Sequence, residues 1–313
     1  MGMGGGSLSR VILTGSSGTI GTRLFERTLE LGFDVIGIDR RENRWKDSYN
    51  FKTMDVDLLY EDECEKLPTD VDLIVHLAAN ARVYELVKAP SLALENIIST
   101  FNVLEFARKN GINKVILASS RDTYGNVPDG IAVCEEMADI RNCESPYSAS
   151  KMSSEALVYA YNRVYGINFV VARLSNVYGM YDISDRVIPL WVKQTINNQD
   201  LIIYGEGKVL DFVYIDDAVD GLVRIIGGFA EVKNDVFNIA FGKGIKIRYV
   251  AERIIALLNG RNKMIIKGNR PGEVWGFEAD ITKARKLLGY EPKIDIEEGL
   301  KRTVQWYKTF YSG

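Results

Sequence analysis

The sequence contains little histidine and cysteine: of its 313 residues, one is His and three are Cys. The cysteines, Cys64, Cys134 and Cys143, have no CxxC spacing and are odd in number, so we expect neither a disulfide framework nor a metal site. His76 ends an apolar segment and is expected to be a hydrogen-bonded core residue. Proton transfer at neutral pH therefore has to rely on another residue type, because histidine is the side chain that ordinarily titrates there.

Long basic runs and long apolar runs are also absent. With a formal net charge of -3, the chain offers no electrostatic basis for binding nucleic acid. No apolar stretch approaches the ~20 residues of a membrane span, and no charged-then-apolar signal segment precedes the first expected strand. We therefore expect no membrane partner and a cytoplasmic protein. The apolar content of 46% and charged content of 26% are typical of a globular chain.

Strand and helix patterns alternate over the first ~180 residues, which predicts a parallel sheet covered by helices. The expected strands cover residues 11–14, 35–38, 73–77, 115–118 and 169–173. A smaller lobe is expected to collect residues 187–197, 248–259, 264–267 and 296–307. The Gly/Ser-rich residues 1–9 are expected to be a flexible leader.

The first expected strand runs into a glycine-rich turn with the spacing G-x-x-G-x-x-G, and a helix follows at about residue 20. Glycines in such a turn admit a pyrophosphate close to the backbone, and the N–H groups of the helix face it. The second strand ends in Asp39, which is 18 residues after Gly21 and is the expected reader of the ribose hydroxyls. The pattern predicts dinucleotide contacts by Gly15, Gly18, Thr19, Ile20 and Gly21.

Asp39 favours NAD over NADP, because its carboxylate would repel a 2′-phosphate. Arg40 and Arg41 leave an alternative open. They either belong to a solvated turn or pair with a 2′-phosphate if Asp39 turns away.

Tyr147 and Lys151 are four residues apart, and Ser145 and Pro146 before them are typical of a helix N-cap and first helical residue. The two side chains are therefore expected on one helix face. A free tyrosine ionises near pH ~10, so a phenolate at pH 7 requires about 4 kcal/mol of preferential stabilisation. The positive charge of Lys151 and the helix N-terminus both favour the phenolate. We expect them to lower the pKa of Tyr147 and to make it a general base.

With this glycine turn and Tyr147-x-x-x-Lys151, the sequence resembles the extended short-chain dehydrogenase/reductase family, and within it the NAD-dependent nucleotide-sugar epimerases and dehydratases. The resemblance implies a Rossmann-type doubly wound parallel sheet with a smaller α/β substrate-binding lobe. It places an NAD-binding domain at residues 10–178, with segments returning near 211–240, and a substrate lobe at residues 179–313. It also implies a homodimer, formed through helices around residues 92–109 and 147–165.

The resemblance also implies further contacts in the NAD-binding domain. Asp55 and Val56 are expected to meet the adenine. Ser120 matches the catalytic Ser/Thr of the family, which hydrogen-bonds the sugar hydroxyl that is oxidised. The other residues expected to border the cofactor are Leu77, Ala78, Ala79, Asn96 and Ser119.

In the second half of the chain the resemblance implies substrate contacts. Asn176 and Arg270 are expected at the diphosphate of the sugar nucleotide, and Val187 begins the first helix of the substrate lobe. Phe277 lies in the segment that lines the sugar pocket in related epimerases, where a bulky residue favours glucose or galactose over N-acetylhexosamines.

Two departures from the family pattern concern substrate binding. Leu210 replaces a usual arginine, so one phosphate contact is missing or is supplied by Lys208 or Arg186. Arg121 follows Ser120 and either recognises a uronate carboxylate or is a loop arginine that faces solvent. We prefer the second interpretation.

The resemblance implies an NAD-dependent 4-epimerase of the UDP-glucose/UDP-galactose type, with Tyr147 as base, Ser120 as proton relay and Lys151 at the nicotinamide ribose. A 4-ketosugar reductase would use the same residues. A dehydratase would require an acid pair, for which Asp122 and Glu135 or Glu136 are the nearby candidates. A non-catalytic NAD-binding sensor or scaffold is a further alternative, which the intact Tyr147 and Lys151 disfavour.

Overall fold

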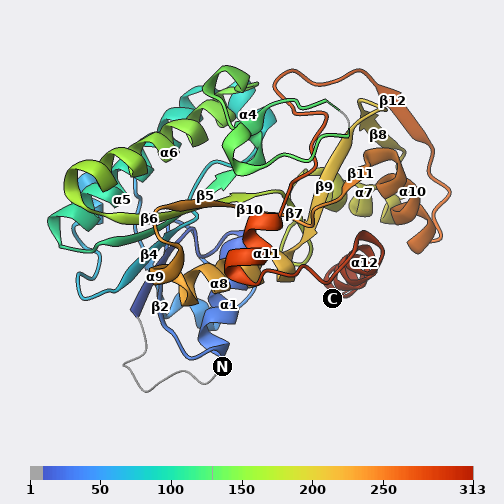
Figure 1. Ribbon diagram of the computed structural model, residues 1–313. Coiled ribbons are helices and arrows are strands. Elements are labelled where there is room, and N and C mark those ends of the chain that lie inside the picture. Colours follow the sequence, from blue (N-terminus) through green and yellow to red (C-terminus); the bar gives the residue numbers. More distant parts are fainter. Residues whose placement is uncertain (1–9, 129, 313) are drawn as a thin grey trace.

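A seven-stranded parallel sheet forms the centre of the protein in the computed structural model, which describes residues 10–128 and 130–312 (Figure 1). The predicted leader, residues 1–9, lies outside the described residues. All neighbouring strands run parallel, in the order β10-β6-β5-β4-β1-β2-β3. The strands are β1 (Arg10–Thr14), β2 (Asp34–Asp39), β3 (Thr53–Asp55), β4 (Leu73–His76), β5 (Lys114–Ser120), β6 (Asn168–Leu174) and β10 (Asp235–Ile239).

Helices cover both faces of this sheet (Figure 1). Helices α5 (Ser91–Lys109) and α6 (Pro146–Tyr165) pack together on one face, and α1 (Thr19–Glu30) and α8 (Ile215–Gly227) on the other. The strands are apolar on both sides because each face is buried. Ile12 belongs to the core beneath α5 and α6, whereas its neighbours Val11 and Leu13 belong to the opposite core.

This arrangement confirms the predicted Rossmann-type fold, and the five expected strands agree with the structure to within two residues at each end. The strand order reverses between β1 and β4, so the carboxyl ends of these strands flank a switch point of the sheet. Open α/β sheets bind their ligands at such a point.

The second lobe contains two small sheets. One consists of β7 (Asn176–Tyr178), β9 (Val209–Tyr214) and β11 (Gly244–Lys246), and the other of β8 (Leu201–Tyr204) and β12 (Met264–Lys267). Its helices are α7 (Val187–Ile196), α10 (Ile247–Leu257) and α12 (Ile296–Ser312). The remaining elements are short: α2 (Asp47–Asn50), α3 (Glu61–Cys64), α4 (Val83–Lys88), α9 (Phe229–Val232), α11 (Thr282–Leu288) and the 3-10 turns η1 (Arg121–Tyr124), η2 (Glu135–Met137) and η3 (Ile140–Asn142).

Two elements after residue 178 pack against the first lobe. Helix α8 packs on α1, and β10 pairs with β6. Strand β9 does not join the central sheet, because it pairs with β7 and β11. The predicted domain boundary at residue 178 stays a prediction.

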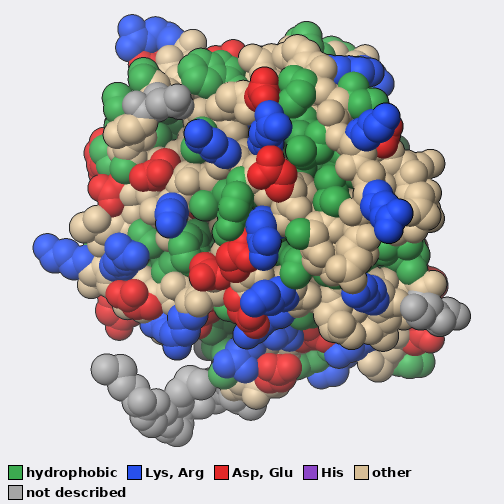
Figure 2. All heavy atoms as spheres, turned by 90° about the vertical axis from the view of Figure 1, so that its right-hand side faces the viewer, with side chains coloured by type: hydrophobic (Ala, Val, Ile, Leu, Met, Phe, Trp, Pro, Cys, Tyr) green, Lys and Arg blue, Asp and Glu red, His purple; other side chains and the backbone are tan. Residues whose placement is uncertain are grey.

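Figure 2 shows the face of the molecule on the side of the second lobe, where positive and negative side chains are interspersed. Exposed ion pairs on α10 and α12 include Arg248 with Glu252 at 3.1 Å and Arg302 with Glu298 at 2.7 Å. Such pairs contribute at most about 1 kcal/mol each, so the buried apolar residues dominate the stability of this lobe. None of the described helices has the length and apolar composition required to cross a bilayer.

Candidate active site

Helix α6 begins where the sequence predicts. The Ser145 hydroxyl accepts the N–H of Ser148 at 3.2 Å, and the Ser148 hydroxyl accepts the N–H of Ser145 at 3.0 Å. Pro146 occupies the first turn. This reciprocal cap fixes the start of the helix, so Tyr147 and Lys151 are both buried on the face toward the end of β5.

Lys151 contacts the main chain of β5 rather than a carboxylate. Its Nζ donates to the Ala118 carbonyl at 2.9 Å and lies 6.0 Å from the centre of the Tyr147 ring. Burial lowers the pKa of Lys151 to about 8, against the opposing charge of Glu155. The ammonium is therefore still predominantly protonated at pH 7.

The predicted decrease in the pKa of Tyr147 is wrong for the protein alone. This pKa is raised to about 12, first by burial and then by the charge of Asp122, whereas a hydrogen bond with Ser120 and the charges of Arg186 and Arg121 oppose the rise. The sequence pattern did not reveal that Tyr147 is only 6% exposed. Ionisation at pH 7 then requires about 7 kcal/mol, so Tyr147 is a neutral phenol until a bound positive charge assists it.

Ser120 and the two residues after it form a buried cluster at the end of β5. The Ser120 hydroxyl donates to Oδ2 of Asp122 at 2.8 Å. Arg121 is 8% exposed, and its guanidinium lies 5.6 Å from the centre of the Phe277 ring. The preferred interpretation of Arg121 as a solvent-facing arginine is therefore wrong, because the 3-10 turn η1 directs it inward.

Ser119 belongs to a second buried network that sequence reasoning missed. Its hydroxyl donates to Glu155 at 2.5 Å, and the same carboxylate accepts two hydrogen bonds from Arg173, at 3.0 and 2.7 Å. Arg173 also donates to Tyr124 at 3.0 Å, and Tyr124 donates to Asn238 at 2.6 Å. The only signal in the sequence was a polar residue inside the apolar strands β6 and β10. The predicted cofactor contact of Ser119 stays a prediction.

The glycine turn is packed too tightly for side chains at two of its positions. A Cβ on Gly15 would lie 2.8 Å from the backbone nitrogen of Ala78, and one on Gly21 would lie 2.0 Å from the Gly15 carbonyl oxygen. Gly15 also has a φ of +70°, which favours glycine. The turn therefore holds β1, the loop after β4 and the start of α1 in close contact, as a dinucleotide-binding turn requires.

Two buried atoms in this turn test whether a dinucleotide fits. The hydroxyls of Ser16 and Ser17 have no hydrogen-bond partner among the described residues. They lie beside Gly18, the N-cap of α1, which has no side chain to accept the first N–H groups of the helix. Unpaired hydroxyls and helix N–H groups are suited to phosphate oxygens, so the turn fits a pyrophosphate. The contacts predicted for Thr19 and Ile20 stay predictions; the Thr19 hydroxyl donates to the Tyr181 carbonyl at 3.1 Å.

Asp39 does not turn away from the ribose position. Its carboxylate accepts the N–H groups of Ser17 and Arg41, each at 3.0 Å. Arg40 forms an ion pair with Asp57 at 3.4 Å, and the Arg41 guanidinium lies 3.9 Å from Asp39. Both arginines thus face carboxylates of this chain, which favours NAD over NADP.

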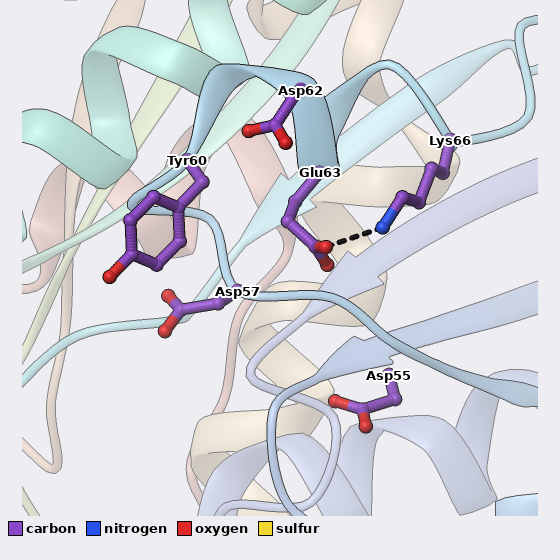
Figure 3. Close-up of a pocket in the computed structure, with 6 residues that line it drawn as sticks. All are labelled: Asp55, Asp57, Tyr60, Asp62, Glu63 and Lys66. Atoms are coloured by element: carbon purple, nitrogen blue, oxygen red, sulfur yellow. Dashed lines mark hydrogen bonds and ion pairs between the residues drawn. The ribbon is translucent and has the colours of Figure 1, made fainter.

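Asp55 lines a separate pocket beside β3, whose other lining residues come from the segment that follows (Figure 3). Glu63 and Lys66 form an ion pair there, and the other acidic side chains leave the pocket negatively charged. A pocket of this charge is unsuited to phosphate, and it does not contain the residues around Tyr147. The adenine contacts of Asp55 and of the buried Val56 stay predictions. The lining residues are Asp55, Asp57, Tyr60, Asp62, Glu63 and Lys66.

The loop after β4 is held by hydrogen bonds on both sides. The N–H of Ala78 donates to the Thr14 hydroxyl at 3.2 Å, and the N–H of Asn80 donates to the Asn96 side chain at 2.7 Å. Asn96 in turn donates to the Asn80 carbonyl and to Ser150 of α6. Its amide donors are thus taken by the protein, which makes it a positioning residue. Its cofactor contact, and those of Leu77, Ala78 and Ala79, stay predictions.

His76 is a hydrogen-bonded core residue, as expected. Its Nδ1 lies 2.8 Å from the Thr14 hydroxyl and its Nε2 lies 3.2 Å from the Thr100 hydroxyl. Because the Thr100 hydroxyl donates to the Asn96 carbonyl, it accepts from His76, which assigns the proton to Nε2. Burial lowers the pKa of His76 to about 3.

This pKa predicts a loss of stability in acid. Between pH 6.5 and 3 the unfolded state binds the His76 proton and the folded state does not, so stability is full above pH ~6.5 and falls as the pH drops. From pH 8 to pH 5 the wild type is expected to lose about 2 kcal/mol more than His76→Gln, which has no group to titrate. Urea unfolding at both pH values measures this difference. Equal losses in the two proteins would refute it.

The predicted substrate residues are only partly brought together. Arg186 acts electrostatically on Tyr147, and its Nη2 donates to the Ala81 carbonyl at 3.1 Å. Val187 starts α7 beside it, as expected. Phe277 is buried and stacks on Tyr124, with 5.8 Å between ring centres. Arg186 thus acts on Tyr147 itself, and Phe277 lies against Arg121 and Tyr124 of the turn after Ser120.

Asn176 and Arg270 each contact other groups of the protein. The Asn176 amide donates to the Asp211 carbonyl at 2.9 Å. Arg270 stacks on Tyr204 of β8, 3.8 Å from the ring centre, and lies 4.8 Å from the ring centre of Tyr84 in α4. It therefore bridges the two lobes, and its diphosphate contact stays a prediction, as does that of Asn176.

The replacement of an arginine by Leu210 leaves a buried apolar residue in β9. Lys208, one proposed substitute, is 5% exposed and donates to Glu273 at 2.8 Å. Since Lys208 is already paired, Arg186 is the better substitute of the two.

Asp211, next to Leu210, fastens the second lobe to the sheet. Its carboxylate accepts the N–H groups of Phe241, Gly242 and Lys243, at 3.0, 2.9 and 3.2 Å. Burial raises the pKa of Asp211 to about 7, which these N–H groups oppose. The sequence analysis assigned no role to this residue.

Comparison with known proteins places these features in one family. The profile of the NAD dependent epimerase/dehydratase family matches residues 11–240. The chain is 33% identical to a putative UDP-glucose 4-epimerase of Methanocaldococcus jannaschii, over 95% of this chain and 98% of that one. It is 28% identical to dTDP-glucose 4,6-dehydratase of Streptomyces niveus, over 96% and 93% of the two chains.

Solved structures share the fold of the protein. UDP-glucuronic acid 4-epimerase from Bacillus cereus, in complex with UDP-glucuronic acid and NAD, superposes with a TM-score of 0.89 at 27% identity and covers 96% of this chain and 100% of that one. The family, the glycine turn and the conformation of Asp39 agree on NAD as the cofactor. The chain therefore belongs to the NAD-dependent epimerase/dehydratase family.

Proposed function

We propose that the protein is a nucleotide-sugar 4-epimerase of the UDP-glucose/UDP-galactose type. The observation that carries this proposal is the cluster of Tyr147, Ser120 and Lys151 at the end of β5, next to the switch point of the sheet. NAD, when bound, accepts the C4 hydride of the sugar and returns it. The relatives with 4-epimerase activity in their names support the same reaction.

In this mechanism Tyr147 takes the proton of the sugar O4 through Ser120 or directly. Its neighbours prepare this step, since Ser120 hydrogen-bonds the phenol and Arg186 and Arg121 favour the phenolate. Lys151, held by the Ala118 carbonyl, keeps its ammonium 6.0 Å from the centre of the Tyr147 ring and would hold the nicotinamide ribose of NAD. Tyr147 would return the proton to O4 once the keto sugar has flipped over in the pocket and presents its opposite face to the nicotinamide.

A dehydratase is less well supported by the side chains at the site. Of the acidic candidates, Asp122 reaches Ser120, but the Glu135 carboxylate accepts the N–H of Asn238 at 2.8 Å and the Glu136 side chain is 72% exposed. Neither glutamate is therefore available, in the described part of the chain, as the second acid for eliminating water. A 4-ketosugar reductase would use the same three residues and is distinguished only by its demand for reduced cofactor.

The test is to incubate the purified protein, without added cofactor, with a panel of UDP-, dTDP- and GDP-sugars and to analyse the products by chromatography and mass spectrometry. A new product of unchanged mass is expected with UDP-glucose or UDP-galactose. Loss of water or carbon dioxide would assign a dehydratase or decarboxylase instead, and reduction of a 4-keto sugar nucleotide by added NADH, with no reaction of the other sugars, would assign a reductase. The preference for glucose-type over N-acetylated sugars, based on Phe277, stays a prediction that the same panel tests. The cytoplasmic location also stays a prediction.

We also propose that the protein is a homodimer. An apolar stripe on α5 is exposed at one-turn spacing, with Leu94, Ile98 and Phe101 exposed by 60%, 43% and 43%. Such a stripe is suited to pack against the same helix of a second copy. Light scattering is expected to give twice the chain mass of 35.1 kDa for the wild type and for Phe51→Glu, a control at another exposed aromatic, and a monomer for Phe101→Glu. A monomeric wild type would refute the dimer.

A further inference from the structure

Two buried polar atoms beside Ser120 have no hydrogen-bond partner among the described residues. Arg121 and Asp122 are 8% and 6% exposed, yet Nη1 of Arg121 and Oδ1 of Asp122 form no hydrogen bond with any described residue. Buried polar atoms are normally paired, because an unpaired one loses its hydration without compensation. The pair is therefore expected to be completed by a bound ligand.

The pair lies next to the groups assigned to the sugar O4. The other oxygen of Asp122 accepts the Ser120 hydroxyl at 2.8 Å, so the unpaired Oδ1 belongs to a carboxylate already fixed at the site. The Arg121 guanidinium is held over the Phe277 ring. Both charges also act on Tyr147. A ligand group that satisfies the pair is thus a substituent near the reacting carbon of the sugar.

The charges of the pair determine what kind of group it accepts. Nη2 of Arg121 lies 3.8 Å from Oδ1 of Asp122, so the two formal charges cancel locally. What remains is an unpaired donor group, Nη1 of Arg121, and an unpaired acceptor, Oδ1 of Asp122. A hydroxyl satisfies both, since it accepts from Arg121 and donates to Asp122. A carboxylate only accepts, and it would be buried against Asp122 with no net positive charge to balance it.

Because the keto sugar flips over during 4-epimerisation, this requirement applies to both sides of its ring. In a 4-epimerase the keto sugar presents each side to the same wall of the pocket in succession. A neutral hexose carries hydroxyls on both sides, whereas a hexuronate brings its carboxylate to the pair in one of the two orientations. We propose that Arg121 and Asp122 together select neutral hexoses over hexuronates by pairing with a sugar hydroxyl. This inference rests on the proposed 4-epimerase function.

The experiment compares kcat/KM for UDP-glucose and UDP-glucuronate in the wild type, Asp122→Asn and Arg121→Met. The wild type is expected to favour UDP-glucose by at least ~10-fold, the scale of one charge-assisted hydrogen bond. Asp122→Asn keeps an acceptor for Ser120 but leaves Arg121 unbalanced, so the ratio shifts toward UDP-glucuronate by ~10-fold or more. Arg121→Met leaves the Asp122 charge unbalanced, so the ratio shifts the other way. Each ratio is taken within one protein, which cancels a loss common to both substrates.

If a variant does not turn over, the affinities of the two sugar nucleotides are compared by calorimetry, with the same expected shifts. A wild type that prefers UDP-glucuronate, or an identical ratio in all three proteins, would overturn the selection while epimerisation itself upholds the proposed function. A wild type that epimerises neither sugar would overturn the function and the inference built on it.

Discussion

Tyr147→Phe is expected to lower turnover at least ~100-fold, the usual scale for removing a general base. The phenol hydrogen-bonds Ser120, and the charges of Arg186 and Arg121 favour its anion. Phenylalanine keeps the ring, which packs with Leu86 and Ala93, so the fold should be unaffected. Initial rates of epimerisation, together with thermal unfolding, measure the two effects separately.

The matched control is Tyr159→Phe, which removes a tyrosine hydroxyl from the same helix at a position 40% exposed. Its turnover should stay close to that of the wild type. If Tyr147→Phe also retained a near-normal rate, Tyr147 would not be the base, and the assignment of the whole cluster would have to be abandoned.

Glu155→Gln is expected to reduce the free energy of unfolding by about 3–5 kcal/mol, the cost of breaking a buried ion pair. Glu155 is 3% exposed and neutralises the Arg173 guanidinium through two hydrogen bonds. Glutamine is nearly the same size, but it leaves the arginine charge buried without a counter-charge. The same change should lower the pKa of Lys151 further, since the charge of Glu155 raises it.

Urea unfolding provides the measurement, and Glu298→Gln is the control. Glu298 forms an exposed pair with Arg302 at 2.7 Å, whose loss should cost less than about 1 kcal/mol. Equal losses for the two variants would show that the pair between Glu155 and Arg173 contributes no more than a surface pair.

The parts of the protein that the sequence predicts well are those with local signals. Ser145 and Pro146 predict the start of α6 because capping involves only residues next to one another in the chain. Gly15 and Gly21 predict the turn because no other residue fits the close approach that the structure shows there. The parallel sheet follows from the alternating patterns, since neighbouring parallel strands need a crossover connection, usually a helix.

The parts that could not be predicted depend on which distant segments meet. Arg121 looks like a surface arginine in the sequence, and only the fold shows that Phe277 covers it. The network of Ser119, Glu155 and Arg173 joins β5, α6 and β6 through side chains that are 36 and 18 residues apart in the chain. The pKa of Tyr147 could not be predicted either, because burial and the charge of Asp122, which raise it, become evident only in the packed structure.

The most direct test of the proposed function is the fate of deuterium at C4. UDP-galactose labelled with deuterium at C4 is incubated with the purified protein and no added NADH. We expect UDP-glucose of unchanged mass with the deuterium still at C4, because the hydride that leaves the sugar returns to the same carbon. Loss of the label, its appearance at another carbon with loss of water, or no conversion until NADH is added would contradict a 4-epimerase.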